Sequence, residues 1–167
     1  VIYDSVGLFS APRLWWTLKV FGVDNVSLLA GGLPAWVAEE RLLETGPAPP
    51  TPAVFTPRFD PTLVADAAQV LENLATGGAQ IVDARSAERF RGEAAEPRPG
   101  LRSGHMPGAH NLPFQNLIDD GRLKDPASLA RAFAAAGIDL NQKMIASCGS
   151  GLTACILSLA YAATGRG

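Results

Sequence analysis

Residues 143–157 have the sequence KMIASCGSGLTACIL, which carries the strongest fold signal in the chain. Residues 144–146 form a short apolar run, which predicts a buried strand. The chain then passes through Gly149 and Gly151 and resumes as an alanine-rich apolar segment over residues 153–164. That segment predicts a helix with Thr153 near its first turn. A strand, a loop of small residues and a helix point several backbone N–H groups toward one centre, where they favour negative charge.

Cys148 lies at the head of this loop and is the candidate nucleophile. The N–H groups of the loop stabilise a thiolate, so we expect the pKa of this thiol to be lowered. Gly149 and Gly151 let the backbone turn inward without a Cβ in the way. The alternative is a buried structural cysteine before a turn, because free cysteine is often buried. Cys155 lies inside the apolar helix, without polar neighbours, and is expected to be an inert core residue.

Residues 148–154, CGSGLTA, resemble the active-site loop of the 3-mercaptopyruvate sulfurtransferases, which belong to the rhodanese superfamily. Five further stretches support this resemblance: GHMPGA at 104–109, VDAR at 82–85, RFRG at 89–92 leading to EPR at 96–98, FSAPR at 9–13 and GGLPAW at 31–36. The resemblance covers nearly the whole chain. It implies a rhodanese-like α/β fold, in which helices flank a central, mostly parallel sheet.

Members of this family have two rhodanese domains, and the resemblance predicts parts of both. Residues 1–43 would be the C-terminal part of a first, non-catalytic domain. Residues 44–60 are rich in proline and would be the linker, because several prolines in so few residues favour an extended spacer. Residues 61–167 would be most of a second, catalytic domain that lacks its C-terminal end. The chain is therefore expected to be a fragment truncated at both ends.

Local patterns predict the elements around these motifs. Near the start we expect strands at residues 1–3 and 26–29, and a helix capped by Ser10 with Leu14, Leu18 and Phe21 on its apolar face. Further along we expect a brief strand at 63–64, a helix at 66–76 capped by Asp66 and a strand at 80–82 that ends at Asp83. A strand at 110–112 and a helix from 125 to 137 complete the prediction.

The resemblance also assigns roles to the residues around Cys148. A sulfurtransferase holds sulfur as a persulfide on a thiolate, and the N–H groups of residues 149–153 would stabilise its charge. The candidate substrate-binding residues are Arg89, Arg98, Gly149, Gly151, Leu152 and Thr153. The two arginines match the family's substrate arginines and would bind the carboxylate of 3-mercaptopyruvate. Ser150 would relay protons beside the cysteine or cap the helix, and Asp83 would support the loop from the neighbouring strand end.

The expected reaction moves the sulfur of 3-mercaptopyruvate to a thiol such as thioredoxin or glutathione, or to cyanide, and releases pyruvate. In thiosulfate-specific relatives the two residues after the cysteine are typically basic, whereas here they are Gly149 and Ser150. A thiosulfate:cyanide sulfurtransferase and a catalytically silent binding module are the alternatives. The dual-specificity phosphatases of the same fold need an arginine where this chain has Ala154, which disfavours phosphatase chemistry.

Composition excludes several other classes. The formal net charge is −2, which argues against nucleic-acid binding. No apolar run reaches the length of a membrane span. Two cysteines of different character do not predict a disulfide framework, and two lone histidines do not predict a metal site. No cofactor is expected, and a reactive thiol favours the cytoplasm.

Overall fold

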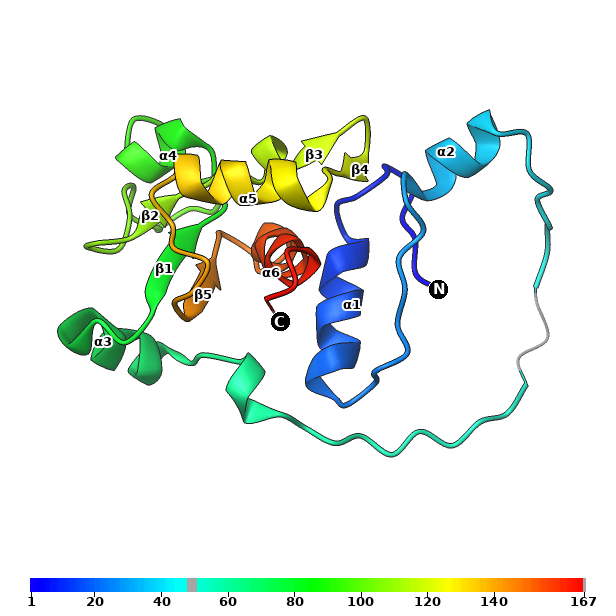
Figure 1. Cartoon of the computed structure of the whole chain (residues 1–167), viewed down its shortest axis with the longest axis horizontal. Coiled ribbons are helices and arrows are strands. Elements are labelled where there is room, and N and C mark those ends of the chain that lie inside the picture. Colours follow the sequence, from blue (N-terminus) through cyan, green and yellow to red (C-terminus); the bar gives the residue numbers. More distant parts are fainter. Residues whose placement is uncertain (48–50, 167) are drawn as a thin grey trace.

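A parallel sheet with the strand order β2-β1-β5 forms the centre of the computed structural model, which describes residues 1–47 and 51–166 (Figure 1). Its strands are β1 (Gln80–Asp83), β2 (His110–Asn111) and β5 (Met144–Ser147). In the register of β1 and β5, Asp83 lies opposite Ser147. The carboxyl ends of these strands therefore meet at one edge, where an open α/β sheet places its functional residues. The predicted α/β fold with a parallel sheet is confirmed.

Helices cover this sheet and enclose the core. The capping box of Asp66 and Gln69 starts α3 as predicted, since each side chain accepts the other's backbone N–H. The helix α6 is buried against α5 and the short helix η2. The elements of this region are α3 (Ala67–Thr76), α4 (Ala87–Arg91), η2 (Phe114–Leu117), β3 (Ile118–Asp119), β4 (Arg122–Leu123), α5 (Pro126–Ala135) and α6 (Thr153–Ala163). The largest fully buried side chains are Phe133, Leu112, Leu117, Leu129, Ile156, Leu157, Val82 and Pro12.

The first segment packs onto this region through α1 (Ala11–Val20), which lies beside α6 (Figure 1). A second helix, α2 (Gly32–Ala38), follows it. The two strands predicted at residues 1–3 and 26–29 are reduced to one parallel bridge between Ile2 and Leu28. The two segments therefore lie side by side, but they pair at one residue each and are too briefly paired to count as strands.

Two predictions about α1 are wrong. Ser10 occupies the N-cap position, but its side chain makes no capping hydrogen bond. Instead the buried carboxylate of Asp4 accepts the N–H groups of Phe9, Ser10 and Ala11. The predicted apolar face is also not the buried one, because Leu14 is 49% exposed. The helix buries Ala11, Pro12 and Val20 instead, because its packing against α6, and not the spacing of its leucines, decides which face is covered.

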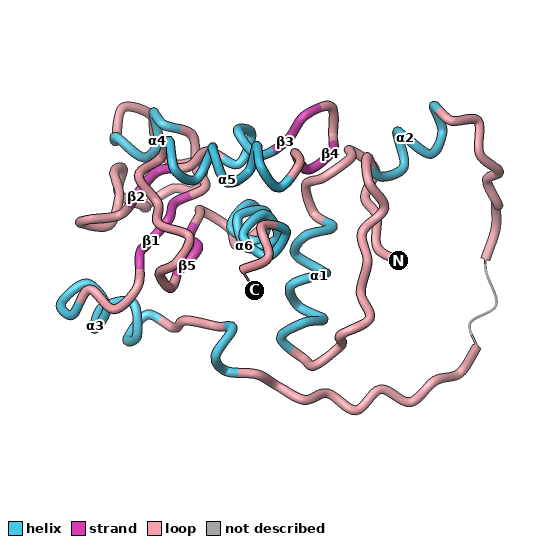
Figure 2. Tube along the Cα trace, in the orientation of Figure 1, coloured by secondary structure: helices cyan, strands magenta, loops and turns pink. Residues whose placement is uncertain are grey.

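Residues 41–47 and 51–60 contain no helix or strand (Figure 2). The middle of the predicted linker, residues 48–50, lies outside the described residues. The predicted strand at 63–64 is wrong, because Pro61–Leu63 forms the short helix η1. Asp60 accounts for this turn, since its side chain accepts the N–H of Thr62 and its N–H donates to the carbonyl of Val20.

Substituting Gly32 by alanine is expected to lower the free energy of unfolding by about 2–4 kcal/mol, through backbone strain and steric overlap. Gly32 has a φ of +57°, and a Cβ there would lie 2.6 Å from the carbonyl oxygen of Asp4. Gly77→Ala is the matched control, because Gly77 also has a positive φ of +71° but no atom within 4 Å of its Cβ position. Urea unfolding followed by tryptophan fluorescence measures both. Equal losses would show that the backbone around Asp4 moves to admit the methyl group.

Candidate active site

The sulfur of Cys148 lies where β5 ends and α6 begins. Its Sγ accepts the N–H of Gly151 at 3.0 Å. Gly151 has a φ of +80°, a conformation that glycine adopts without strain. The N-cap position of α6 is Leu152, which makes no side-chain capping hydrogen bond. The cysteine sulfur therefore binds an N–H of the loop that leads into α6, at a helix start that no side chain caps.

The pKa of Cys148 is lowered although the residue is half-buried. Burial alone raises this pKa, but hydrogen bonds from the Thr153 hydroxyl and from the N–H groups of Ser150, Ala154 and Gly151 outweigh it. These donors stabilise the thiolate more than the thiol. Cys155 shows the opposite behaviour, because burial raises its pKa more than the neighbouring Arg13 lowers it. Both cysteines are free.

The rate of Cys148 alkylation by iodoacetamide is expected to rise with pH and to level off below the range of a free thiol, which titrates near ~8.5. The sign follows from the lowered pKa, since the thiolate is the reactive form and dominates at a lower pH. The measurement is the alkylation rate from pH 5 to 10, with the modified residue identified by mass spectrometry. Cys155 is the internal control and should react slowly throughout. A rate that still climbs above pH 9 would contradict the thiolate assignment.

A buried network of four charges lies beside the loop. Arg85 donates to both oxygens of Asp83, at distances from 2.6 to 3.1 Å, and to Oε1 of Glu96 at 2.8 Å. Arg89 binds Glu96 in two-pronged fashion, at 3.2 and 2.6 Å. The side chains of Asp83 and Glu96 are 3% and 4% exposed. Two buried carboxylates are thus neutralised by two guanidinium groups.

The structure brings Arg89 to the loop but not Arg98. A Cβ added at Gly149 would lie 2.7 Å from Nη2 of Arg89, so the guanidinium rests against the backbone next to Cys148. Arg98 is exposed, in the loop after α4, and takes no part in the ion pairs found among the described residues. Asp83 differs from its expected role, because all its side-chain hydrogen bonds go to Arg85. Its carboxylate orients the charge network and does not bind the Cys148 loop directly.

The loop residues have distinct positions. Ser150 is exposed and offers its backbone N–H to the sulfur, while Thr153 offers its hydroxyl. The N-cap of α6 is Leu152, so the capping role considered for Ser150 is wrong. Within residues 1–47 and 51–166, no group of three or more His, Cys, Asp or Glu side chains is arranged to hold a metal ion. In the same ranges no helix is long and apolar enough to span a membrane.

Sequence reasoning missed two residues that touch this region, Arg13 and Glu96. Nη1 of Arg13 donates to the carbonyl of Gly151 at 3.2 Å across 138 positions of sequence. Both residues fall within motifs that resemble the family, but no local pattern assigns a contact to either of them. Only a long-range packing argument could have found them.

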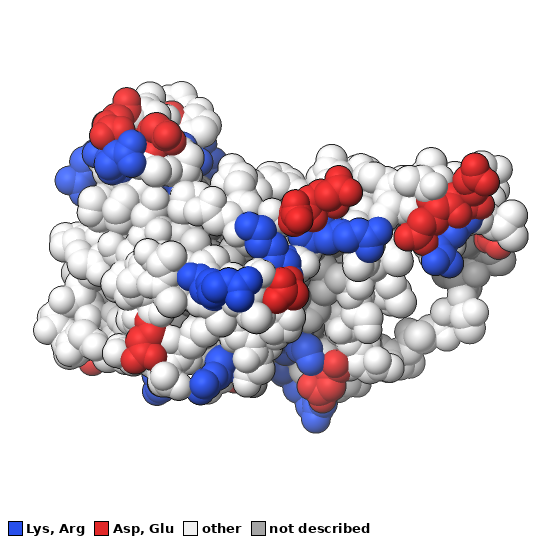
Figure 3. All heavy atoms as spheres, turned by 45° about the horizontal axis from the view of Figure 1, so that its top comes forward, with Lys and Arg blue, Asp and Glu red and all other residues white. Residues whose placement is uncertain are grey.

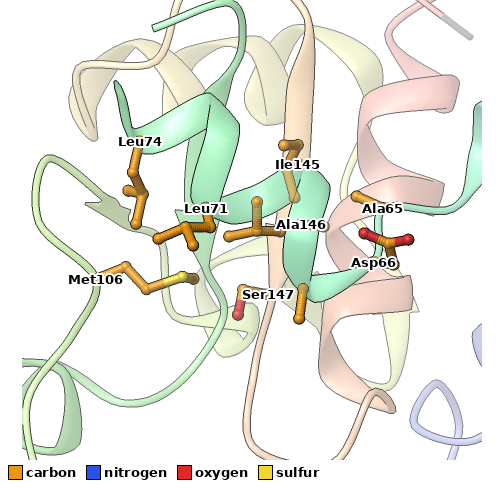
Figure 4. Close-up of a pocket in the computed structure, with 10 residues that line it drawn as sticks. Ala65, Asp66, Leu71, Leu74, Met106, Ile145, Ala146 and Ser147 are labelled. Atoms are coloured by element: carbon orange, nitrogen blue, oxygen red, sulfur yellow. The ribbon is translucent and has the colours of Figure 1, made fainter. Parts of the chain in front are cut away.

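A separate apolar groove lies between α3 and β5 (Figure 4). Leu71, Leu74, Met106 and Ile145 contribute side chains to it, and Cys148 is not part of its lining. On the face drawn in Figure 3, acidic side chains mostly lie next to basic ones. Arg91 with Glu93 and Arg41 with Glu39 are exposed pairs of this kind. Neither the groove nor these exposed ion pairs bring a charged group to the Cys148 loop.

Comparison with known proteins places this geometry in a family. The model of the rhodanese-like domain matches residues 66–166, which contain the sheet, the charge network and the Cys148 loop. This chain belongs to the rhodanese family. The rhodanese match covers the second, larger part of the chain, from the N-cap of α3 to just beyond α6.

Relatives of this rhodanese chain include enzymes with two donor specificities. It is 45% identical to the 3-mercaptopyruvate sulfurtransferase of Escherichia coli K12 over 162 residues, which are 97% of this chain and 58% of that protein. It is 42% identical to the thiosulfate sulfurtransferase of Cricetulus griseus over 170 residues, 99% of this chain and 57% of that protein. The crystal structure of E. coli SseA, a 3-mercaptopyruvate sulfurtransferase, superimposes with a TM-score of 0.87 at 41% identity, covering 98% of this chain and 61% of that one. The chain thus spans a little over half the length of these relatives.

Proposed function

We propose that this chain carries the catalytic site of a sulfurtransferase that takes sulfur from 3-mercaptopyruvate. The observation that carries the proposal is the Cys148 sulfur, which accepts backbone N–H groups at the start of α6 and has a lowered pKa. A thiolate held in this way is a ready nucleophile. The relatedness to 3-mercaptopyruvate sulfurtransferases, at 45% identity to the E. coli enzyme, supports the same chemistry.

The reaction would proceed in two transfers. The Cys148 thiolate attacks the sulfur of the donor, the carbon–sulfur bond breaks, and its electrons pass to the leaving pyruvate enolate. The enolate takes up a proton and leaves as pyruvate, while Cys148 holds the sulfur as a persulfide. An acceptor thiolate or cyanide then attacks the outer sulfur and regenerates the Cys148 thiolate. The exposed hydroxyl of Ser150 is the group we assign to the proton transfer near the cysteine.

Arg89 is the group we assign to the donor carboxylate. Its side chain is 25% exposed and lies against Gly149, one residue from the nucleophile. Glu96 holds two of its nitrogens, so the guanidinium is already oriented when the substrate arrives. Arg98 would need to swing in from its exposed loop to take part.

The loop favours 3-mercaptopyruvate over thiosulfate as the donor. Overall identity does not separate the two specificities, because both kinds of relative lie above 40%. Gly149 and Ser150 carry no charge, whereas the dianion thiosulfate is better served by added cations. A long side chain at position 149 would also have to displace Arg89, whose Nη2 lies 2.7 Å from the Cβ position.

The remaining parts of the proposal concern the setting of this site. We propose that the acceptor is a thiol such as thioredoxin or glutathione, or cyanide, and that the protein lies in the cytoplasm, where thiols stay reduced. We further propose that residues 1–43 belong to a first rhodanese domain, that 44–60 link it to the second, and that 61–167 form the catalytic domain. Residue 167 lies outside the described residues.

A donor competition tests the proposed function. Pyruvate and sulfide release from 3-mercaptopyruvate with a dithiol is compared with thiocyanate formation from thiosulfate and cyanide. We expect kcat/KM to be higher for 3-mercaptopyruvate by at least about tenfold, from the uncharged loop and the fit of one carboxylate to Arg89. A preference for thiosulfate would overturn the donor and keep the sulfurtransferase. No turnover with either donor in a folded protein would favour a binding module.

A further inference from the structure

Both the N–H and the carbonyl of Gly151 make hydrogen bonds with side chains. Its N–H donates to the Sγ of Cys148 at 3.0 Å. Its carbonyl oxygen accepts two donors, Nη1 of Arg13 at 3.2 Å and the Sγ of Cys155 at 3.1 Å. One of these donors comes from α1 and the other from α6. Gly151 therefore connects the sulfur of the nucleophile to a guanidinium supplied by the first segment of the chain.

The contact with Arg13 is built by packing. Arg13 lies in the first turn of α1, and that helix lies beside α6 (Figure 1). Its guanidinium stacks over the ring of Trp16 at 4.7 Å, which holds the side chain against its own helix. The approach to the loop is close, because a Cβ at Gly151 would lie 2.9 Å from Nη1. Because Gly151 has no side chain, the Arg13 guanidinium has enough space to reach the Gly151 carbonyl.

We propose that Arg13 is a positioning residue, which fixes the orientation of Gly151 and thereby holds the Gly151 N–H on the sulfur of Cys148. The proposal rests on the proposed function in so far as Cys148 is the nucleophile. Glycine is the residue with the greatest backbone freedom, so an unrestrained Gly151 would spend time with its N–H turned away. Two donors on its carbonyl remove that freedom. Arg13 binds the loop and not the reacting sulfur, so it acts through Gly151.

The other charged and titratable groups around the loop come from different elements. Arg89 of α4 and its partner Glu96 lie at Gly149, and Cys155 of α6 shares the Gly151 carbonyl. Arg89 and Glu96 bind each other and not Arg13, whereas Arg13 also lowers the pKa of Cys155. The alkylation of Cys155 is therefore followed beside that of Cys148, so that a change in the Cys148 profile can be separated from a change in the neighbouring thiol.

The test measures the alkylation of Cys148 by iodoacetamide from pH 5 to 10 in Arg13→Ala, Arg13→Gln and Arg13→Lys. For Arg13→Ala and Arg13→Gln we expect the rate at pH 7 to fall about three- to tenfold and the profile to move to higher pH, the effect of weakening one hydrogen bond to the thiolate. Arg13→Lys should recover part of the loss, since its ammonium group can still donate to the Gly151 carbonyl. Arg41→Ala is the matched control, because Arg41 also lies over a tryptophan ring but does not contact the loop.

Salt distinguishes positioning from a simple charge effect. We expect the shift in Arg13→Ala to persist at 0.5 M NaCl, where the field of a surface charge is screened within a few ångströms. A shift that disappears in salt, or a profile of folded Arg13→Ala or Arg13→Gln that superimposes on the parent, would overturn the proposal. Cys148→Ser identifies the alkylation signal. Failure of the proposed function would appear separately, as absence of sulfur transfer in the parent chain, and the alkylation profiles would remain readable.

Discussion

Replacing Cys148 by serine is expected to lower the rate of sulfur transfer at least about a thousandfold, because it removes the covalent intermediate. A serine hydroxyl stays protonated at neutral pH, so the N–H groups of Gly151 and Ser150 have no anion to stabilise. The oxygen also cannot form a persulfide. The measurement is kcat/KM for 3-mercaptopyruvate with a dithiol acceptor, together with intact-mass analysis of protein treated with the donor alone.

The matched control for this variant is Ser158→Ala, an equally small change within α6. The Ser158 hydroxyl binds only the carbonyl of Ala154 within its own helix. We expect the control to transfer sulfur at the parent's rate and to gain the mass of one sulfur atom from the donor. Transfer by Cys148→Ser within tenfold of the parent, or a persulfide mass on that variant, would show that another group receives the sulfur.

Replacing Arg85 by methionine is expected to lower the free energy of unfolding by about 3–5 kcal/mol, because it leaves buried carboxylates without their cation. Asp83 would lose every side-chain hydrogen bond except the one from the Arg85 backbone N–H. Glu96 would keep only Arg89. Methionine fills a similar length without charge, so the loss reports the charge network and not a cavity. Urea unfolding at pH 7 measures it.

Arg91→Met is the control for this prediction. Arg91 pairs with Glu93 at 2.7 Å in the same region, but the two side chains are 51% and 56% exposed. An exposed pair contributes little, so we expect a change within about 0.5 kcal/mol. Similar losses for Arg85→Met and Arg91→Met would contradict the view that burial makes the Arg85 network essential. Arg85 also holds Glu96, and Glu96 orients Arg89, the residue assigned to the donor carboxylate. Arg85→Met should therefore also raise the KM for 3-mercaptopyruvate.

Much of the site could be predicted because its signals are local. The apolar run before Cys148, the two glycines after it and the alanine-rich segment from Thr153 define a strand, a loop and a helix within a few residues. Asp66 and Gln69 form a capping box three residues apart, so the start of α3 is also marked by a local pattern. A helix start presents free N–H groups wherever it occurs, so the anion-binding character of the Cys148 loop also follows from sequence.

The predictions that failed depend on what surrounds an element. Leu14, Leu18 and Phe21 have helical spacing, yet α1 buries Ala11, Pro12 and Val20, because the partner helix decides which face is covered. Asp60 and Pro61 turn the chain where Leu63 and Val64 alone favour a strand. Periodicity shows that a segment has an apolar face but does not show what packs against it.

The candidate nucleophile, the glycine-containing loop after it and the parallel α/β class could all be predicted from the sequence, since each depends on neighbours within one turn or one strand. Which side chains contact that loop depends on the packing of the folded chain. Arg13 reaches Gly151 because α1 packs on α6, and Arg85 joins Asp83 to Glu96 because β1 and the loop after α4 meet beside the sheet. Contacts of this kind join residues with no shared local pattern. Their energy depends on burial, which exists only once the chain has folded.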